Sequence, residues 1–266
     1  MPITLPDVEL VAFNTATASE NKIHDNTVAA ALGFGSGLVP GVDVHAYLCQ
    51  PALAHWGRDL LTNGQLTVRF DAPVYDGEPT TVRATVDDEG VLAASIASRD
   101  TTAATLTGRL VDRHPTPPTT TATPLPDERP PASPETLAPG TSLGSITDRC
   151  DREAGRRYLS DIRDIASPVD DWGVVHPAWL LRRANELISH NVLLGPWIHV
   201  GSTINHHRPL ALGETLVVQG QVSRAYEHKG HRFVVVEGVM TGEDDGVVAA
   251  VRHTAIYEPR QVRESA

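Results

Sequence analysis

The sequence has little cysteine, no excess of basic residues and no long apolar run. Its two cysteines, Cys49 and Cys150, are far apart and lack the spacing of a metal site, so we expect both to be reduced and buried. Lys and Arg total 22 against 33 Asp and Glu, a net charge of -11, and this acidic balance argues against a nucleic-acid partner. No window approaches the roughly 18 apolar residues of a membrane span, and no leader peptide is evident. We therefore expect a soluble, cytoplasmic protein with no membrane or nucleic-acid partner.

A segment rich in proline and threonine divides the 266 residues into halves of similar length. Between positions 114 and 143 these residues disfavour a regular helix or strand, so we predict an extended, semi-rigid linker. The predicted organisation is an N-terminal half over 1–113, the linker over 114–143 and a C-terminal half over 144–266.

Each half has the same predicted plan, one helix followed by a run of strands. Alternating or β-branched stretches, separated by turns that contain glycine, indicate the strands. An offset of 136 positions takes Gly37 to Gly173 and Pro73 to Pro209 without a gap, which indicates an internal duplication. Long meandering strands of this kind form antiparallel sheets. We predict an α+β fold in which two antiparallel sheets each wrap around a central helix.

The stretch from Ala16 to Leu48 resembles the signature of the MaoC-like (R)-specific enoyl-CoA hydratases and dehydratases. That signature has Asn, Pro, an aliphatic residue and His in succession, then five residues and Ala or Ser, then Gly-Phe, and finally a Gly where the central helix starts. The matching residues are Asn21, Ile23, His24, Ala30, Gly33, Phe34 and Gly41. The resemblance implies a tandem, or double, hotdog fold. It also implies a lyase whose substrate is an acyl thioester such as a 2-enoyl-CoA or a 3-hydroxyacyl-CoA, with no metal and no separate cofactor. We expect that two chains can form a homodimer.

The same resemblance assigns chemistry to this stretch. His24 would act as general base on the water that adds to the double bond. The backbone N–H of Gly41, helped by the helix dipole, would polarise the thioester carbonyl. Asn21 and Ser19 complete the predicted site. Ser19, however, stands where the family has its catalytic Asp, and Pro40 stands where the family has a His before the Gly.

The missing carboxylate has several candidate replacements. Glu20 and Asp25 flank the loop, but neighbours in an extended loop point in different directions. Carboxylates of the second half could approach across the junction, and four precede its central helix: Asp161, Asp164, Asp170 and Asp171. Ser19 could also hold the water by hydrogen bonding alone.

The second half suggests a different enzyme. His176 stands where its helix is predicted to begin, and Glu186 lies ten residues further along. Some hotdog thioesterases use a helix carboxylate to activate water while amides at a helix start hold the carbonyl. An acyl thioesterase centred on His176 and Glu186 is therefore the alternative activity. A non-catalytic protein that binds an acyl thioester or another small ligand is the third interpretation.

Other polar residues have less specific patterns. Strand alternation predicts that His199 and His207 share a face and that His206 points to the opposite one. No acidic or cysteine partners accompany them at ligand spacing, which argues against a metal site. The arginines available for the phosphates of coenzyme A are Arg69, Arg182, Arg183 and Arg208.

Overall fold

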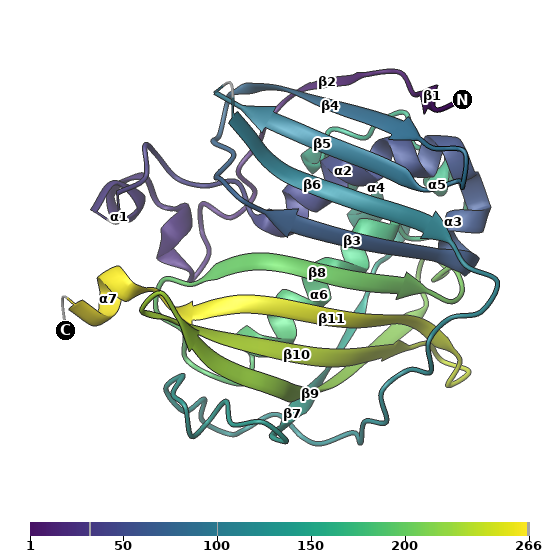
Figure 1. Ribbon diagram of the computed structural model, residues 1–266. Helices are drawn as coiled ribbons and strands as arrows, with labels where there is room; N and C mark the ends of the chain where they lie inside the picture. Colours follow the sequence, from purple (N-terminus) through teal and green to yellow (C-terminus); the bar gives the residue numbers. More distant parts are fainter. Residues whose placement is uncertain (32, 100, 265–266) are drawn as a thin grey trace.

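One curved sheet wraps around two long central helices (Figure 1). The computed structural model describes residues 1–31, 33–99 and 101–264. The elements of the first half are β1 (Ile3–Thr4), β2 (Val8–Val11), η1 (Lys22–His24), α1 (Asn26–Ala31), α2 (Gly41–Trp56), η2 (Gly57–Asp59), α3 (Leu60–Asn63), β3 (Gly64–Phe70), β4 (Pro79–Val86), β5 (Leu92–Ser98) and β6 (Thr101–Leu110). The elements of the second half are β7 (Ser142–Arg149), α4 (Arg152–Asp161), α5 (Val169–Trp172), α6 (Pro177–Ser189), β8 (Ile198–His206), β9 (Thr215–His228), β10 (His231–Thr241), β11 (Val247–Glu258) and α7 (Arg260–Glu264).

The strands of both halves form one antiparallel sheet across the described residues. Its order is β1-β4-β5-β6-β3-β8-β11-β10-β9-β7, with β2 also paired to β4. The helices α2 and α6 contact each other behind the sheet, and each packs on the strands of its own half (Figure 1). The predicted α+β architecture, a central helix and an antiparallel sheet made twice, is confirmed.

The two halves meet where β3 pairs with β8. In this ladder Gln65 faces Asn205, Arg69 faces Gly201 and Thr67 faces Thr203 at the centre. The hydroxyl groups of Thr67 and Thr203 lie 3.0 Å apart, and the two residues are separated by 136 positions. The separation equals the sequence offset, so equivalent residues of the duplication pair with each other about a local two-fold axis.

Both central helices are explained by what they bury. Along α2 almost every side chain from Val42 to Leu53 is buried, because the helix lies between its own sheet and α6. The helix α6 starts with Pro177, a residue suited to a first helical position because its missing N–H would have no helical partner there. The apolar side chains of α6 face the core. As predicted, Cys49 and Cys150 are both free and buried.

Residues 111–141 connect β6 to β7 without a helix or a strand. The segment nevertheless packs on the second half: Leu137 is fully buried and Thr123 exchanges hydrogen bonds with Ser145. Arg129, from the same segment, donates hydrogen bonds to Glu20 and to the carbonyl oxygen of Ser189. The connection therefore contributes to the surface that lies next to the predicted site.

Candidate active site

His24 is held in one orientation and one protonation state. It ends the short helix η1, and its Nδ1 lies 2.7 Å from the carbonyl oxygen of Leu38. A carbonyl oxygen only accepts, so Nδ1 carries the proton and Nε2 keeps its lone pair. Burial lowers the pKa of His24, so the imidazole is neutral at pH 7. The arrangement is that of a general base with Nε2 as the basic atom.

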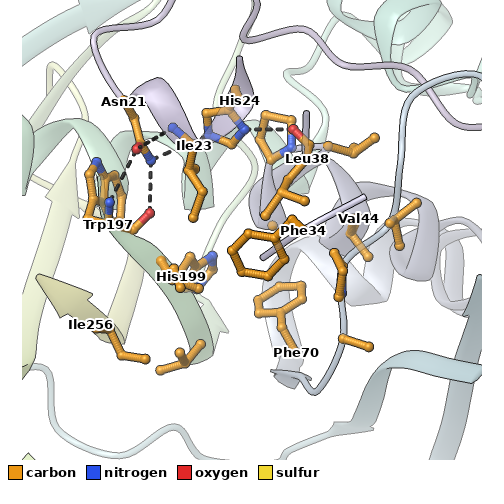
Figure 2. A pocket seen from close by; sticks show the side chains of 18 of the residues that line it. Asn21, Ile23, His24, Phe34, Leu38, Val44, Phe70, Trp197, His199 and Ile256 are labelled. Carbon is orange, nitrogen blue, oxygen red and sulfur yellow. Dashed lines mark hydrogen bonds between the residues drawn. The ribbon is translucent and has the colours of Figure 1, made fainter. Parts of the chain in front are cut away.

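Asn21 connects the loop that carries His24 to the second half of the chain by two hydrogen bonds. Its Nδ2 donates to the carbonyl oxygen of Trp197 at 3.0 Å, and its Oδ1 accepts from the backbone N–H of Trp197 at 3.2 Å. Nδ2 also lies 3.5 Å from Nε2 of His24 (Figure 2). The amide thus places His24 relative to Trp197, which directly precedes β8 and lies 176 positions after Asn21.

A cavity of about 300 Å³ opens beside His24 and is mostly apolar. Side chains from both halves line it, as Figure 2 shows. Its apolar lining includes Ile23, Phe34, Leu38, Val44, Phe70 and Ile256. Such a lining suits a short hydrocarbon chain.

Gly41 brings the start of α2 into the same cavity. Pro40 precedes it and provides no side-chain cap, and among the described residues the N–H groups of Gly41 and Val42 have no acceptor. A side chain on Gly41 would crowd the cavity, because a Cβ there would lie 3.1 Å from Nδ1 of His199 and 3.4 Å from Phe70. Free amides at the positive end of a helix favour an oxygen that gains negative charge.

A second cavity of about 520 Å³ adjoins the first and has several charged side chains in its lining. His24, Asn21 and Pro40 line both, so the base stands where the two cavities meet. The second cavity contains the guanidinium groups of Arg129 and Arg182. Arg182 also pairs with the buried carboxylate of Asp43 at 2.5 Å.

Ser19 does not occupy the place of a catalytic carboxylate. Its hydroxyl accepts from the backbone N–H of Asn21 at 3.1 Å, which shapes the local turn, and it lines only the second cavity. Asp25 caps the amides of Thr27 and Val28. Glu20 lines the second cavity but pairs with Arg129.

The carboxylates of the second half are engaged elsewhere. Asp164 binds His176, and Asp170 pairs with Arg152 and Arg156. Neither Asp161 nor Asp171 lines the two cavities. None of the six carboxylates weighed from the sequence contacts the cavity beside Gly41; the acidic residue there is Asp71, which pairs with Arg69 at 2.7 Å.

Asn185 was missed by the sequence analysis. It lies on α6, lines both cavities, and its Oδ1 is buried without a hydrogen-bond partner among the described residues. A buried carbonyl-type oxygen without a donor is expensive, so it is suited to bind a water or a ligand group. The available signal was its position next to the apolar face of a helix, as an uncharged polar residue.

The structure does not bring His176 and Glu186 together. His176 is buried, accepts a hydrogen bond from the N–H of Ala178 and lies 3.1 Å from Asp164. Glu186 lies at the other end of α6, roughly 15 Å along a helix axis. It lines the second cavity and pairs with Arg183 at 2.7 Å, although burial raises the pKa of its carboxyl.

The prediction for the histidines of β8 was wrong. Both His199 and His206 point into the core, and His207 follows the end of the strand. Opposite Thr254 and Ala255 the ladder skips Val200, so a bulge changes the alternation. Among the residues that the structure describes, no group of three His, Cys, Asp or Glu side chains is arranged to hold a metal.

Of the four arginines considered for phosphates, Arg182 alone lines either of the two cavities described above. Arg183 pairs with Asp148, and Arg208 pairs with Glu214. Arg129, which comes from the connecting segment, is the additional cation at the second cavity.

Within the described part of the chain, no helix is both long and apolar enough to cross a membrane.

Comparison with known proteins places the fold. No model of a protein family matches the sequence, and no curated protein matches it. Solved structures do match: a MaoC domain protein of Chloroflexus aurantiacus J-10-fl superposes with a TM-score of 0.66 at 14% identity over 97% of this chain and 95% of that one. A protein of Mycobacterium tuberculosis described as having a double hotdog fold gives 0.66 at 15% identity over 96% and 95%.

Thioesterases are also among the similar structures. A protein of Lactobacillus plantarum named as an oleoyl thioesterase gives a TM-score of 0.54 at 11% identity, over 96% of this chain and 97% of that one. Identities this low show the fold and leave the activity open. The predicted likeness to MaoC-like proteins is confirmed at the level of fold: the chain is a double hotdog.

Proposed function

We propose that the protein is a hydratase or dehydratase that adds water to a 2-enoyl thioester or removes it from a 3-hydroxyacyl thioester. The observation that carries the proposal is the position of His24. A neutral imidazole whose Nε2 keeps its lone pair stands where an apolar cavity meets one lined by charged side chains, next to the open start of α2. A thioester has these three parts in the same order: an apolar chain, a carbonyl and a polar carrier.

The cavities divide the substrate between them. The acyl chain occupies the apolar cavity, and the phosphate-bearing carrier passes Arg129 and Arg182 in the second cavity. The thioester carbonyl then lies at the junction, where the N–H of Gly41 can donate to its oxygen. The β-carbon comes next to Nε2 of His24.

Hydration requires that a proton be removed from water and that a proton be delivered to the α-carbon of the substrate. Nε2 of His24 removes a proton from water as the water oxygen bonds to the β-carbon, and the double-bond electrons move to the carbonyl oxygen as an enolate. The imidazolium returns this proton to the α-carbon, so the sum is addition of one water. The unpaired Oδ1 of Asn185 accepts a hydrogen bond from the water and replaces the missing carboxylate as its anchor.

A thioesterase is the second candidate, favoured by Glu186. Its carboxyl lines the second cavity and burial raises its pKa, as suits a group that takes a proton from water. The attack would then be on the carbonyl carbon and would release a free thiol. The expectations of a cytoplasmic location and of a homodimer also remain predictions.

The test follows hydration and thiol release in one series of trans-2-enoyl-CoA thioesters. We expect loss of the enoyl absorbance with wild type and a kcat about 10²–10⁴ lower for His24→Ala, because general-base catalysis contributes that factor. The matched control is His55→Ala, which removes an exposed histidine of the same half. Thiol release without hydration would replace the lyase by a thioesterase, and saturable binding without either reaction would leave a binding protein.

A further inference from the structure

We propose that the neutral imidazole of His199 is a second hydrogen-bond donor to the thioester carbonyl, beside the N–H of Gly41. The inference rests on the proposed function and specifies how its carbonyl site is built. His199 lines the apolar cavity and is only 7% exposed, yet its Nδ1 has no hydrogen-bond partner among the described residues. A Cβ on Gly41 would lie 3.1 Å from this Nδ1, so the unpaired nitrogen is beside the start of α2.

A bulge in β8 aims the imidazole. Gly201 faces Thr254, whereas His199 faces Ala255, so Val200 has no partner in the ladder. In a regular strand, residues three apart point to opposite faces. Here His199 and Ser202 are both buried on the inner face, because the bulge adds one residue between them. Bulges are frequent next to active sites, where they redirect a side chain.

The other side of the imidazole is fixed by a hydrogen-bonded chain. Nε2 of His199 lies 2.8 Å from the hydroxyl of Ser202, which lies 2.9 Å from Nδ1 of His253. The two imidazole rings are stacked with centroids 4.2 Å apart. A hydroxyl between two nitrogens donates to one and accepts from the other, so each ring has a defined tautomer.

The direction of the hydrogen bonds from His253 through Ser202 to His199 decides which nitrogen of His199 carries the proton. Nε2 of His253 is buried without a partner. Either direction of the chain leaves one N–H without a partner, on Nε2 of His253 or on Nδ1 of His199. Because His199 lines the apolar cavity and His253 lines neither cavity, a ligand can pair only with the proton of His199, and the lone pair belongs on Nε2 of His253. His253 then donates from Nδ1 to Ser202, and Ser202 donates to Nε2 of His199. The remaining proton of His199 is on Nδ1, the nitrogen next to Gly41.

Two donors at one oxygen suit the charge that hydration creates. As water bonds to the β-carbon, the carbonyl oxygen becomes an enolate oxygen, and Gly41 and His199 each donate one hydrogen bond to it without losing a proton. Burial, together with the neighbouring His253 and His45, lowers the pKa of His199, so the ring stays neutral through the reaction. Ser202 and His253 are positioning residues that hold the tautomer.

The experiment compares three variants with wild type. His199→Leu removes the donor, and His199→Asn keeps an amide N–H near the position of Nδ1. His206→Leu is the matched control, because His206 is a buried histidine on the same strand, also has an unpaired Nε2, and lines neither cavity. The readouts are kcat on a trans-2-enoyl-CoA and the carbonyl stretching frequency of bound, isotope-labelled butanoyl-CoA, which has no double bond to react.

We expect His199→Leu to lower kcat about 10²–10³-fold and to raise the carbonyl frequency toward its value in water-free solvent, as loss of one such donor does. In His199→Asn, kcat and the carbonyl frequency should return most of the way to their wild-type values. In His206→Leu, both quantities should stay at their wild-type values. The proposal is overturned if His199→Leu leaves the frequency unchanged, if His206→Leu has the same effect as His199→Leu, or if wild type binds no thioester. A frequency shift that depends on His199 without any hydration would support the donor and reject the lyase.

Discussion

The two central helices start in opposite ways although they occupy equivalent places. The offset of 136 positions takes Gly41 to Pro177 and Pro40 to His176. At α2 no side chain caps the first turn, and its first residue, Gly41, lines a cavity. At α6 the first residue has no N–H at all, and His176 accepts from the N–H of Ala178 while it binds Asp164. One helix start is open to a ligand and the other is closed by its own residues.

In this duplicated fold the second half supplies part of the wall of the cavities at His24. The second half contributes Trp197, Asn185, His199 and Arg182 to the cavities at His24. Its own helix start is free to become part of the core. At that helix start the buried polar groups of His176 and Asp164 satisfy each other, so they need no ligand as a partner.

Acid should give the largest effect, and it tests whether the halves are independent. Burial lowers the pKa of His45, His206 and His253 to about 3, and these residues come from both halves. Below the ordinary histidine pKa of about 6.5, the unfolded chain binds protons that the folded chain excludes. The free energy of unfolding should thus be constant above that pH and fall by about 1.4 kcal/mol per pH unit for each histidine below it.

Urea unfolding between pH 7.5 and 5 measures this loss, and His206→Leu provides the control because it removes one of the buried histidines and should reduce the slope. Separate transitions for the two halves would show that the shared core does not couple them. A stability independent of pH over this range would mean that the histidines are not excluded from protonation.

Gly41→Pro would make the open helix start like the closed one. Proline is accepted at a first helical position, so the fold should persist, but the N–H that faces the carbonyl is lost. We expect kcat to fall about 10²–10³-fold, the usual cost of removing one oxyanion donor. Gly41→Ala is the matched control, because it adds the same Cβ against His199 and Phe70 and keeps the N–H. Equal losses in both variants would attribute the effect to crowding instead.

His176→Ala should affect stability and not catalysis. Removing the imidazole leaves the carboxylate of Asp164 and the N–H of Ala178 without their partner, at a cost of about 1–3 kcal/mol. Thermal unfolding measures the loss, and kcat per folded molecule should match wild type. A kcat that falls as far as in His24→Ala would show that the second half has a working site of its own, and the contrast between the helices would be lost.

Much of the site that the sequence predicts is found together in the structure, and the missing parts come from distant segments. Asn21, His24 and Gly41 line one cavity, as the spacing within one loop and one helix start allowed. Asn185 and Trp197 reach the same cavity from the second half, and no local pattern relates them to His24. Ser19 lies beside the site, but its hydroxyl stabilises the local turn because it accepts a hydrogen bond from the N–H of Asn21.

The sequence by itself determined the duplication, the central helices and the loop that carries His24, since each is a local pattern of spacing, turn residues and helix-start chemistry. Only the tertiary structure decided which helix start stays open and which groups face it. Strand alternation predicted His199 and His206 on opposite faces, and a bulge of one residue placed both on the buried face. A bulge arises from the fit between neighbouring strands, β8 and β11, so the physical reason lies in long-range pairing that a local pattern does not contain.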